Sequence, residues 1–393
     1  MQSVGYIVSQ VVQPKHTVAD VLNLEVDHLQ EIAHASWNAR ALHAIRKCRT
    51  KALGGHLDWS IACKKLHLQF NSCRNRHCTT CQGHKQHLWI AARSQELLSV
   101  PYFHVVFTLP DTLNSIALRY PQVLYKILFD SVWETLTAFG NNPKHLGAKL
   151  GMIAVLHTWG QNLSLHPHLH CIVPKGGVSK AGFWKKGKGK DDFLFSVKAM
   201  SDKYRGLFVA KLRKALPELP QSLYDGLFKK KWVVYAKPPF GKPEHVIEYL
   251  GRYTHKIAIS NHRILAIDKA KREVDFSLKD YKKGGQKTRL TLTSKEFIRR
   301  FQLHILPKGF TRIRHYGFLS SSWKKDKLPL LQRQLADKDL LAIETVVIQE
   351  KSLHRICPSC KKGALITLFT FDSRGPPKNY QQTIKRKLLK FKI

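Results

Sequence analysis

"MIAVLHTWGQNLSLHPHLHCIV", residues 152–173, decides the fold of the segment around it. Two apolar runs, 152–159 and 168–173, are separated by a short polar connection, and each has the length and composition of a β-strand. They are predicted to pair as an antiparallel hairpin. Because side chains alternate between the faces of a strand, His168 and His170 share one face, while the apolar residues between and after them pack on the other. The stretch therefore predicts a sheet that presents two imidazoles side by side.

A third metal ligand is expected from the neighbouring strand. A hairpin centred near residue 163 places position 157 opposite 168–170, and position 157 is a histidine. His157 is therefore the predicted third ligand of a divalent ion, with Gln161 as the alternative. Histidines also occur as ordinary polar residues on solvent-facing strands, so the pattern leaves that interpretation open.

Strands and helices are mixed on either side of the hairpin. Residues 101–110 alternate in polarity, and a helix is predicted at about 118–140. The "TSKE" sequence at 293–296 has the spacing of a helix-capping box. Further strands are predicted at 231–236, 256–260, 263–267, 272–277 and 287–292, and a further helix at 243–253. This mixture predicts an α+β domain with a central antiparallel sheet over residues 101–325.

The charge of the chain points to a polyanionic partner. Its 393 residues, long enough for two or three domains, include 66 Lys and Arg against 27 Asp and Glu, a formal charge of +39. Neutralisation of phosphates by Lys and Arg favours nucleic acid, and an anionic membrane surface is the alternative. No run of 18 or more apolar residues and no secretory signal is found, so no membrane partner is expected and a cytoplasmic location is predicted.

The cysteines predict a zinc site. Five of the eight lie between residues 48 and 81, and thiols stay reduced in the cytosol, which favours metal over disulfides. "SCRNRHCTTC" at 72–81 combines thiolates and an imidazole at spacings that suit tetrahedral Zn²⁺. The predicted ligands are Cys63, Cys73, Cys78 and Cys81, with Cys48 and His77 as alternatives. Helical patterns flank the cluster, so residues 1–100 are predicted to form a small helical zinc-binding domain.

A tyrosine pair supplies a candidate nucleophile. On the helix predicted from "PEHVIEYLGRYTHK" (243–256), Tyr249 and Tyr253 are four residues apart and share one face. A phenol can attack a phosphodiester when a metal ion polarises the phosphoryl oxygen. Arg252 and Lys256 add positive charge suited to a phosphate backbone. Aromatic residues at this spacing also line protein cores, which is the other interpretation.

The C-terminal segment, residues 326–393, is predicted to be a basic and partly disordered tail. It contains "CPSC" at 357–360, half of a zinc ribbon without a visible second half. Two interpretations stay open for this pair: a metal shared with another segment, or free cysteines.

Taken together, these motifs resemble the HUH endonucleases, in which two histidines flank an apolar residue and one or two tyrosines cut single-stranded DNA. More closely, the chain resembles the two-tyrosine rolling-circle transposases of bacterial insertion sequences, of the insertion-sequence-ninety-one type, which are related to Helitrons. The matching stretches are "NSCRNRHCTTCQG" (71–83), "PYFHVVFTLP" (101–110), "LHTWGQNLSLHPHLHCIVPKGG" (156–177), "YLGRYTHKIAISNHRI" (249–264) and "FIRRFQLHILPKGFTRIRHYGFL" (297–319).

The resemblance implies a fold and a mechanism. It implies a central antiparallel sheet with the histidine strand in the middle and the tyrosine helix beside it. His168 and His170 correspond to the HUH histidines, which hold Mg²⁺ or Mn²⁺, and Tyr249 and Tyr253 to the paired nucleophiles. One tyrosine would form a 5′-phosphotyrosine and free a 3′ hydroxyl, and the second would receive or resolve a strand, giving rolling-circle transfer. No nucleotide cofactor is expected, because the chain has no G-x-x-x-x-G-K-[ST] motif. Single-stranded DNA would come from a host helicase or the replication machinery, at the nucleoid.

The resemblance also assigns the zinc domain to recognition of DNA ends, with Arg74 and Arg76 as candidate DNA contacts. Related proteins carry a C-x-x-C pair ending at position 63, but here its first residue is Ser60, a weak zinc ligand, so the fourth ligand must come from elsewhere. A replication initiator or a relaxase would use the same site, but the zinc cluster and the lack of a helicase domain favour a transposase. A transposase with three acidic residues is disfavoured by the scarcity of Asp and Glu. A non-catalytic DNA-binding regulator is the remaining alternative.

Overall fold

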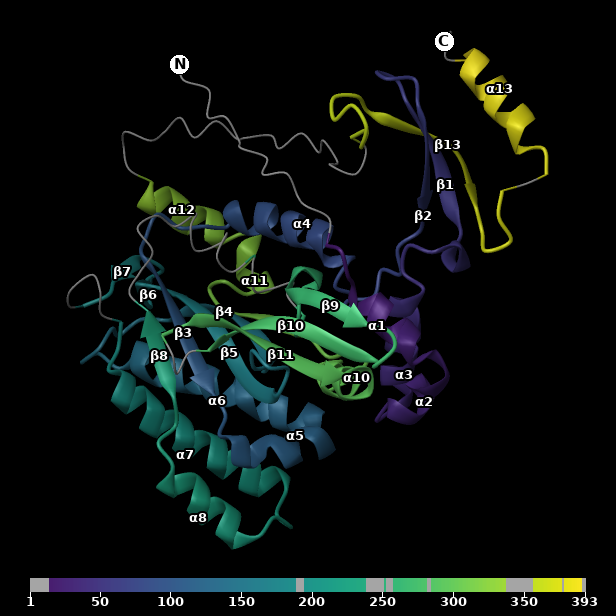
Figure 1. Ribbon diagram of the computed structural model, residues 1–393. Helices are drawn as coiled ribbons and strands as arrows, with labels where there is room; N and C mark the ends of the chain where they lie inside the picture. Colours follow the sequence, from purple (N-terminus) through teal and green to yellow (C-terminus); the bar gives the residue numbers. More distant parts are fainter. Residues whose placement is uncertain are drawn as a thin grey trace.

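The sheet predicted from the histidine stretch forms the centre of the molecule (Figure 1). The computed structural model describes residues 14–188, 194–237, 251, 257–280, 284–336, 356–376 and 378–390. Its central sheet has five strands in the order β12-β4-β5-β3-β8, and every neighbouring pair is antiparallel. The strands are β3 (Tyr102–Thr108), β4 (Gly151–Trp159), β5 (Leu165–Pro174), β8 (Val234–Lys237) and β12 (Ile313–Gly317). Strand β5, which carries the histidines, lies in the middle, so the α+β prediction is confirmed.

The predicted hairpin has the predicted register. His157 of β4 lies opposite His168 of β5, and Val155 lies opposite His170. The pairing is interrupted by an irregularity between His157 and Trp159, just before the connection between the strands. Because directly paired residues project to the same side, all three histidines lie on one face of the sheet.

The other face of the sheet builds the main core. Phe107, Leu156 and Leu169 are fully buried there against helices that lie below the sheet in Figure 1. The predicted helix at 118–140 is confirmed as two helices, and Pro121 is the first residue of the second, where its missing N–H costs no bond. These helices are α5 (Asn114–Arg119), α6 (Pro121–Asn141), α7 (Val197–Ala215) and α8 (Gln221–Lys229), with the 3₁₀ turn η3 (Asp111–Leu113) ahead of α5.

Helices among the described residues cover one end of the histidine-bearing face. Tyr102, Ile153 and Ile172 pack there with residues of three helices that lie above the sheet in Figure 1. The helices are α4 (Gln82–Ser94), α11 (Ser321–Lys324) and α12 (Leu328–Leu335). The short strands β6 (Gly176–Val178) and β7 (Trp184–Lys186) pair beside this layer.

A second core joins the N-terminal helices to a later sheet. It combines residues of the first 81 positions with residues 257–305, so the N-terminal segment packs directly on the rest of the chain. Buried polar groups reinforce the junction: the Gln302 amide oxygen accepts from the His34 N–H at 2.9 Å, and the Ser294 hydroxyl donates to the Glu25 carboxylate at 2.5 Å. The elements are α1 (Val18–Leu24), η1 (Val26–His28), α2 (Leu29–Ile32), α3 (Ser36–Arg46), η4 (Asn261–Arg263), β9 (Ile264–Asp268), β10 (Glu273–Asp280), β11 (Gln286–Thr293) and α10 (Ser294–Gln302).

Two sequence predictions in this region have different outcomes. The predicted cap is confirmed, because the Thr293 side chain accepts from the Glu296 N–H at 3.3 Å at the start of α10. The strand predicted at 256–260 is wrong for its described part. Ile257, Ala258 and Ile259 are buried in the second core, but they belong to no strand, so their apolar character reflects packing without a β-ladder.

The cysteine region contains strands that the helical pattern did not predict. β1 (Gly55–Ser60) and β2 (Leu66–Phe70) form a hairpin, preceded by η2 (Lys51–Leu53). Their third strand is β13 (Leu365–Phe371), so the described part of the predicted C-terminal tail adds a strand, followed by α13 (Tyr380–Lys390). In Figure 1 this sheet stands apart from the central sheet. Among the described residues, no helix has the length and apolar character needed to span a membrane.

Candidate active site

Three histidines converge on one face of the central sheet. His157 comes from β4, and His168 and His170 come from β5, with ligand nitrogens that all lie within 4.8 Å of one another. The Nε2 atoms of His168 and His170 are 3.1 Å apart. His157 and His170 are buried, and His168 is partly exposed. The register argument therefore selected the histidine that completes the group.

A fourth histidine, which the sequence analysis did not select, orients one of the three. His104 of β3 is buried, and its Nε2 lies 2.7 Å from Nδ1 of His170, with the two rings nearly parallel. His104 shares a face of β3 with Val106 and Thr108, opposite Phe103, Val105 and Phe107. Val106 of β3 pairs with His170, and residues two apart on a strand share a face, so His104 lies on the same face as His170. This strand alternation was the signal that could have identified His104.

Hydrogen bonds direct the Nε2 atoms toward one point. Nδ1 of His168 lies 2.6 Å from the backbone carbonyl oxygen of His166, which can only accept, so Nδ1 carries the proton and Nε2 keeps its lone pair. In the metal-free protein, His104 can donate to His170, which in turn donates to His168. When an ion is bound, His170 must instead donate through Nδ1 to His104. Such a bond to the far side of a ligating ring fixes its orientation.

Burial keeps these histidines neutral. It lowers the pKa of His168 to about 4 and holds the pKa of His170 well below the usual value, and the neighbouring histidines lower the pKa of His170 further. Burial also lowers the pKa of His104 to about 4, helped by the charge of Lys237. Neutral imidazole is the form that binds a metal ion. Three nitrogen donors fit a divalent transition ion better than Mg²⁺, which prefers oxygen, so the donor set favours Mn²⁺ of the two predicted ions.

The connection after β4 is held by side chains of later segments. Trp159 stacks on His157 with ring centroids 4.4 Å apart. His304 lies 3.1 Å from the Thr158 hydroxyl and 3.1 Å from the backbone oxygen of Leu163, so it bridges both ends of the connection. The backbone oxygen of Gln161, the alternative third ligand, accepts from Arg263. These contacts keep the hairpin end, and with it His157, in a fixed position.

The tyrosines lie outside the described residues, as do Arg252 and Lys256. Gly251, between the two tyrosines, is described and buried. Its carbonyl oxygen accepts from the Gln86 side chain at 2.7 Å, and a Cβ at this position would lie 2.3 Å from Ile90. Both contacts are with α4, which covers part of the histidine-bearing face.

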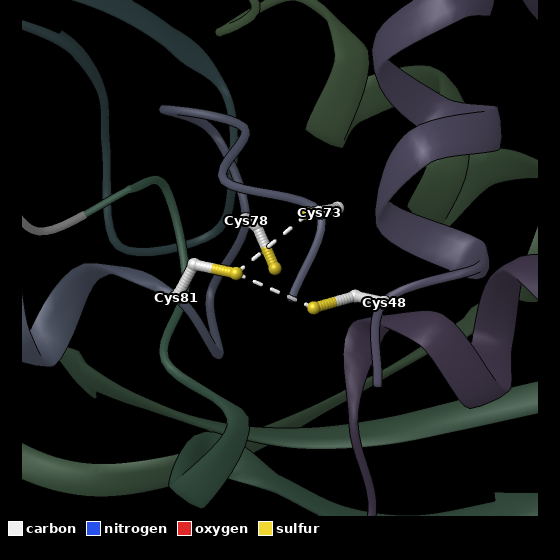
Figure 2. Close-up of side chains that lie close together, drawn as sticks. All are labelled: Cys48, Cys73, Cys78 and Cys81. Atoms are coloured by element: carbon white, nitrogen blue, oxygen red, sulfur yellow. Dashed lines mark hydrogen bonds between the residues drawn. The ribbon is translucent and has the colours of Figure 1, made fainter. Parts of the chain in front are cut away.

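Four cysteines form a compact group, shown in Figure 2. Cys48 follows α3, Cys73 and Cys78 lie in the loop before α4, and Cys81 is the N-cap residue of α4. The sulfur of Cys81 lies 3.3 Å from that of Cys48 and 3.7 Å from that of Cys73. Tetrahedral zinc with Zn–S bonds of about 2.3 Å requires sulfurs about 3.8 Å apart, so the group fits Zn²⁺.

The predicted ligand set needs one correction. Cys48 completes this group in place of Cys63. Cys63 lies in the turn between β1 and β2, where it is close to Cys357 and Cys360 from the segment before β13. The chain turns back after α3, and this brings Cys48 beside the later loop. His77, the other alternative, is buried, and its Nε2 accepts from the Leu306 N–H at 3.1 Å, so that atom serves the fold.

The two arginines predicted to contact DNA have different environments. Arg74 is exposed. The Arg76 guanidinium donates to three backbone oxygens, those of Phe310 at 2.5 Å, Pro307 at 2.7 Å and Leu306 at 3.2 Å. Arg76 therefore fastens the cysteine loop to the segment after α10, and Arg74 remains as the candidate contact from this pair.

Comparison with known proteins identifies the class. Residues 151–327 match the model of a family described as putative transposase, and residues 22–109 match the transposase zinc-binding domain. The chain is 41% identical over 391 residues to the putative transposase y4qJ of Sinorhizobium fredii (strain NBRC 101917 / NGR234), covering 92% of this chain and 97% of that protein. It is 27% identical over 300 residues to the transposase for insertion sequence element IS801 of Pseudomonas savastanoi pv. phaseolicola, covering 73% and 72%. No solved structure matches the chain.

The sheet, the two ligand groups and these matches together define a transposase, an enzyme whose partner is DNA. The zinc-binding domain precedes the putative transposase domain, and the first relative aligns along nearly all of both chains. The chain belongs to the IS91-type transposases, as its motifs had indicated.

Proposed function

We propose that this transposase is an HUH endonuclease and strand transferase that nicks single-stranded DNA at the ends of its element. The observation that carries the proposal is the convergence of His157, His168 and His170, with their ligand nitrogens within 4.8 Å of one another, on one face of the central sheet. A divalent ion bound there, Mn²⁺ or Mg²⁺, would polarise the scissile phosphate and stabilise its developing charge. His157, His168 and His170 would hold it, and His104 would orient the ring of His170.

The covalent step belongs to the tyrosines. The phenol oxygen of Tyr249 or Tyr253 attacks phosphorus and the bond to the 3′ oxygen breaks. The phenolic proton passes to solvent, and the departing 3′ oxygen takes up a proton from solvent. The products are a 5′-phosphotyrosine and a 3′ hydroxyl. The second tyrosine then accepts another 5′ end or resolves the first, in a rolling-circle type of transfer. The phosphotyrosine conserves the energy of the broken linkage, so no nucleotide cofactor is needed. Support comes from Gly251, which lies between the two tyrosines in the sequence and contacts Gln86 and Ile90 of α4.

The zinc-binding segment would recognise the DNA ends. Cys48, Cys73, Cys78 and Cys81 would hold Zn²⁺ and make a rigid scaffold from the loop that carries the exposed Arg74. Arg252 and Lys256 would contact the backbone near the tyrosines. The formal charge of +39 supports DNA binding throughout. A host helicase or the replication machinery would supply single strands in the cytoplasm at the nucleoid.

A covalent-capture assay tests the proposal. Labelled single strands carrying the element's own ends are incubated with the protein and Mn²⁺ or Mg²⁺, and covalent products are resolved on a denaturing gel. A covalent band that requires the ion and single-stranded DNA is expected. Replacing both Tyr249 and Tyr253 with Phe should abolish the band while DNA binding is retained, since each change removes one oxygen. A DNA-binding regulator would instead give no band with the unaltered protein, and its binding would be unaffected by the changes.

Tyr235 provides a matched control. It is exposed on β8 and lies opposite Val106, which also pairs with His170, so it is on the same face of the sheet as the histidines. Tyr235→Phe should leave the covalent band unchanged. If Tyr235→Phe lost the covalent band and the variant with Phe at positions 249 and 253 kept it, Tyr235 would be the nucleophile.

A further inference from the structure

We propose that Cys63, Cys357, Cys360 and His67 form a second zinc site, which fastens the C-terminal strand β13 to the β1–β2 hairpin. The sulfur of Cys63 lies 3.5 Å from that of Cys357, and the sulfurs of all three cysteines lie within 4.8 Å of one another. Almost 300 residues separate Cys63 from Cys357 along the chain. The match to the zinc-binding domain ends at residue 109, so it includes neither Cys357 nor Cys360.

The cysteines lie in two matching turns. Cys63 precedes Lys64, and Cys360 precedes Lys361; both lysines have the left-handed backbone conformation, with φ of 54° and 55°. Arg74, which follows Cys73 in the first cysteine group, has the same conformation with φ of 52°. A non-glycine residue rarely adopts this conformation, so its recurrence after a cysteine at both groups indicates the same kind of metal-binding turn.

The two turns also pack directly on each other. The Ile61 N–H donates to the Ala364 carbonyl at 3.4 Å, and a Cβ added to Gly363 would lie 2.4 Å from the Cβ of Ala62. β1 and β13 continue from this contact as an antiparallel pair, with Ser60 opposite Leu365. Together the turns form the two halves of a zinc ribbon, and the "CPSC" sequence supplies the second half.

The fourth ligand is assigned to His67. It lies on β2, and its Nε2 is 3.2 Å from the sulfur of Cys357 but not within 4.8 Å of all three sulfurs, so the ring must turn toward them to complete a tetrahedron. Ser60 is also near, with its hydroxyl oxygen 3.8 Å from the sulfur of Cys360. Imidazole is a strong zinc donor and a serine hydroxyl a weak one, so the chemistry favours three thiolates and one imidazole.

A zinc cross-link would stabilise this three-stranded sheet, which has a small apolar core. Within the described residues, none of the three main apolar clusters contains a residue of β1, β2 or β13. Leu66 and Leu68 of β2 are exposed. Leu365 and Leu368 of β13 are buried, but a three-stranded sheet with so small an apolar core gains stability from a cross-link, and zinc can supply it where disulfides do not persist.

Cobalt substitution of the full-length protein tests the site. Co²⁺ bound to thiolates gives a ligand-to-metal absorption in the near ultraviolet that a site made only of histidines does not give. The two groups together offer seven thiolates. Replacing both Cys357 and Cys360 with Ser should remove roughly three sevenths of this absorption and about one zinc equivalent per chain. Cys171→Ala, a buried cysteine in neither group, is the matched control and should change neither.

Two further measurements keep the test decisive if the double variant folds poorly. In the unaltered protein, Cys63, Cys357 and Cys360 should resist alkylation until a chelator is added. His67→Ala should shift the visible cobalt bands, and Ser60→Ala should not. Unchanged cobalt absorption in the folded double variant would overturn the proposal. So would ready alkylation before chelation, or a disulfide joining Cys63 to Cys357 in protein purified under reducing conditions.

Discussion

The bond from His104 to His170 should control how tightly the histidine site binds its ion. His104→Phe keeps a flat ring in the space beside His170, where the two rings are 5.0 Å apart and nearly parallel. It removes the nitrogen that lies 2.7 Å from Nδ1 of His170. With an ion on Nε2, that Nδ1 must carry a proton, and in the variant the buried N–H has lost its acceptor.

The cost can be estimated from the bond that is lost. A buried donor without a partner costs about 1–3 kcal/mol, and loss of a partner behind a metal ligand typically weakens binding about 10- to 100-fold. The Kd for Mn²⁺ should therefore rise by about 10- to 100-fold, as measured by calorimetric titration or by the electron paramagnetic resonance signal of free Mn²⁺. His166→Ala is the matched control, because His168 bonds to the backbone oxygen of His166, which this change retains. If folded His104→Phe bound Mn²⁺ as tightly as the unaltered protein, the assigned role of His104 would be refuted.

Three other perturbations test separate parts of the structure. Burial lowers the pKa of His304 to about 4, so the unfolded chain takes up a proton at this position before the folded chain does. The contribution of His304 to the free energy of unfolding should be full above about pH 6.5 and fall by about 1.4 kcal/mol per pH unit down to about pH 4, in addition to the contributions of the other buried histidines. Denaturant titrations at several pH values should show that the free energy of unfolding depends less steeply on pH in His304→Gln. An unchanged pH dependence would show that His304 does not contribute to it. Arg76→Ala should destabilise the fold by about 2–4 kcal/mol, because three carbonyl contacts are lost, whereas Arg74→Ala should leave the melting temperature unchanged and lower the salt dependence of DNA binding; the opposite pattern would reverse these roles. Gly251→Ala should lower the rate of strand cleavage by roughly 10- to 100-fold, because the added Cβ pushes Gly251 away from Ile90 of α4. Adding Ile90→Ala should restore the rate. If Gly251→Ala alone had no effect, the contact between Gly251 and Ile90 would not be needed for catalysis.

The sequence by itself determined the central hairpin and its histidines. Strand periodicity places alternate residues on one face, and the length of the connection sets which residues lie opposite each other. These two local rules were enough to select His157 as the partner of His168 and His170. The excess of basic residues likewise indicated a nucleic-acid partner, because charge composition does not depend on the fold.

Only the tertiary structure decided which distant residues meet. Cysteine spacing identified the metal-binding residue type, but the turn of the chain after α3 brings Cys48, not Cys63, to the first group, and β13 brings Cys357 and Cys360 to Cys63. His104 and Arg76 obtained their partners in the same way, from neighbouring strands and from a loop more than 200 residues away. Side-chain periodicity acts over a few residues, whereas such encounters depend on how whole elements pack around shared cores.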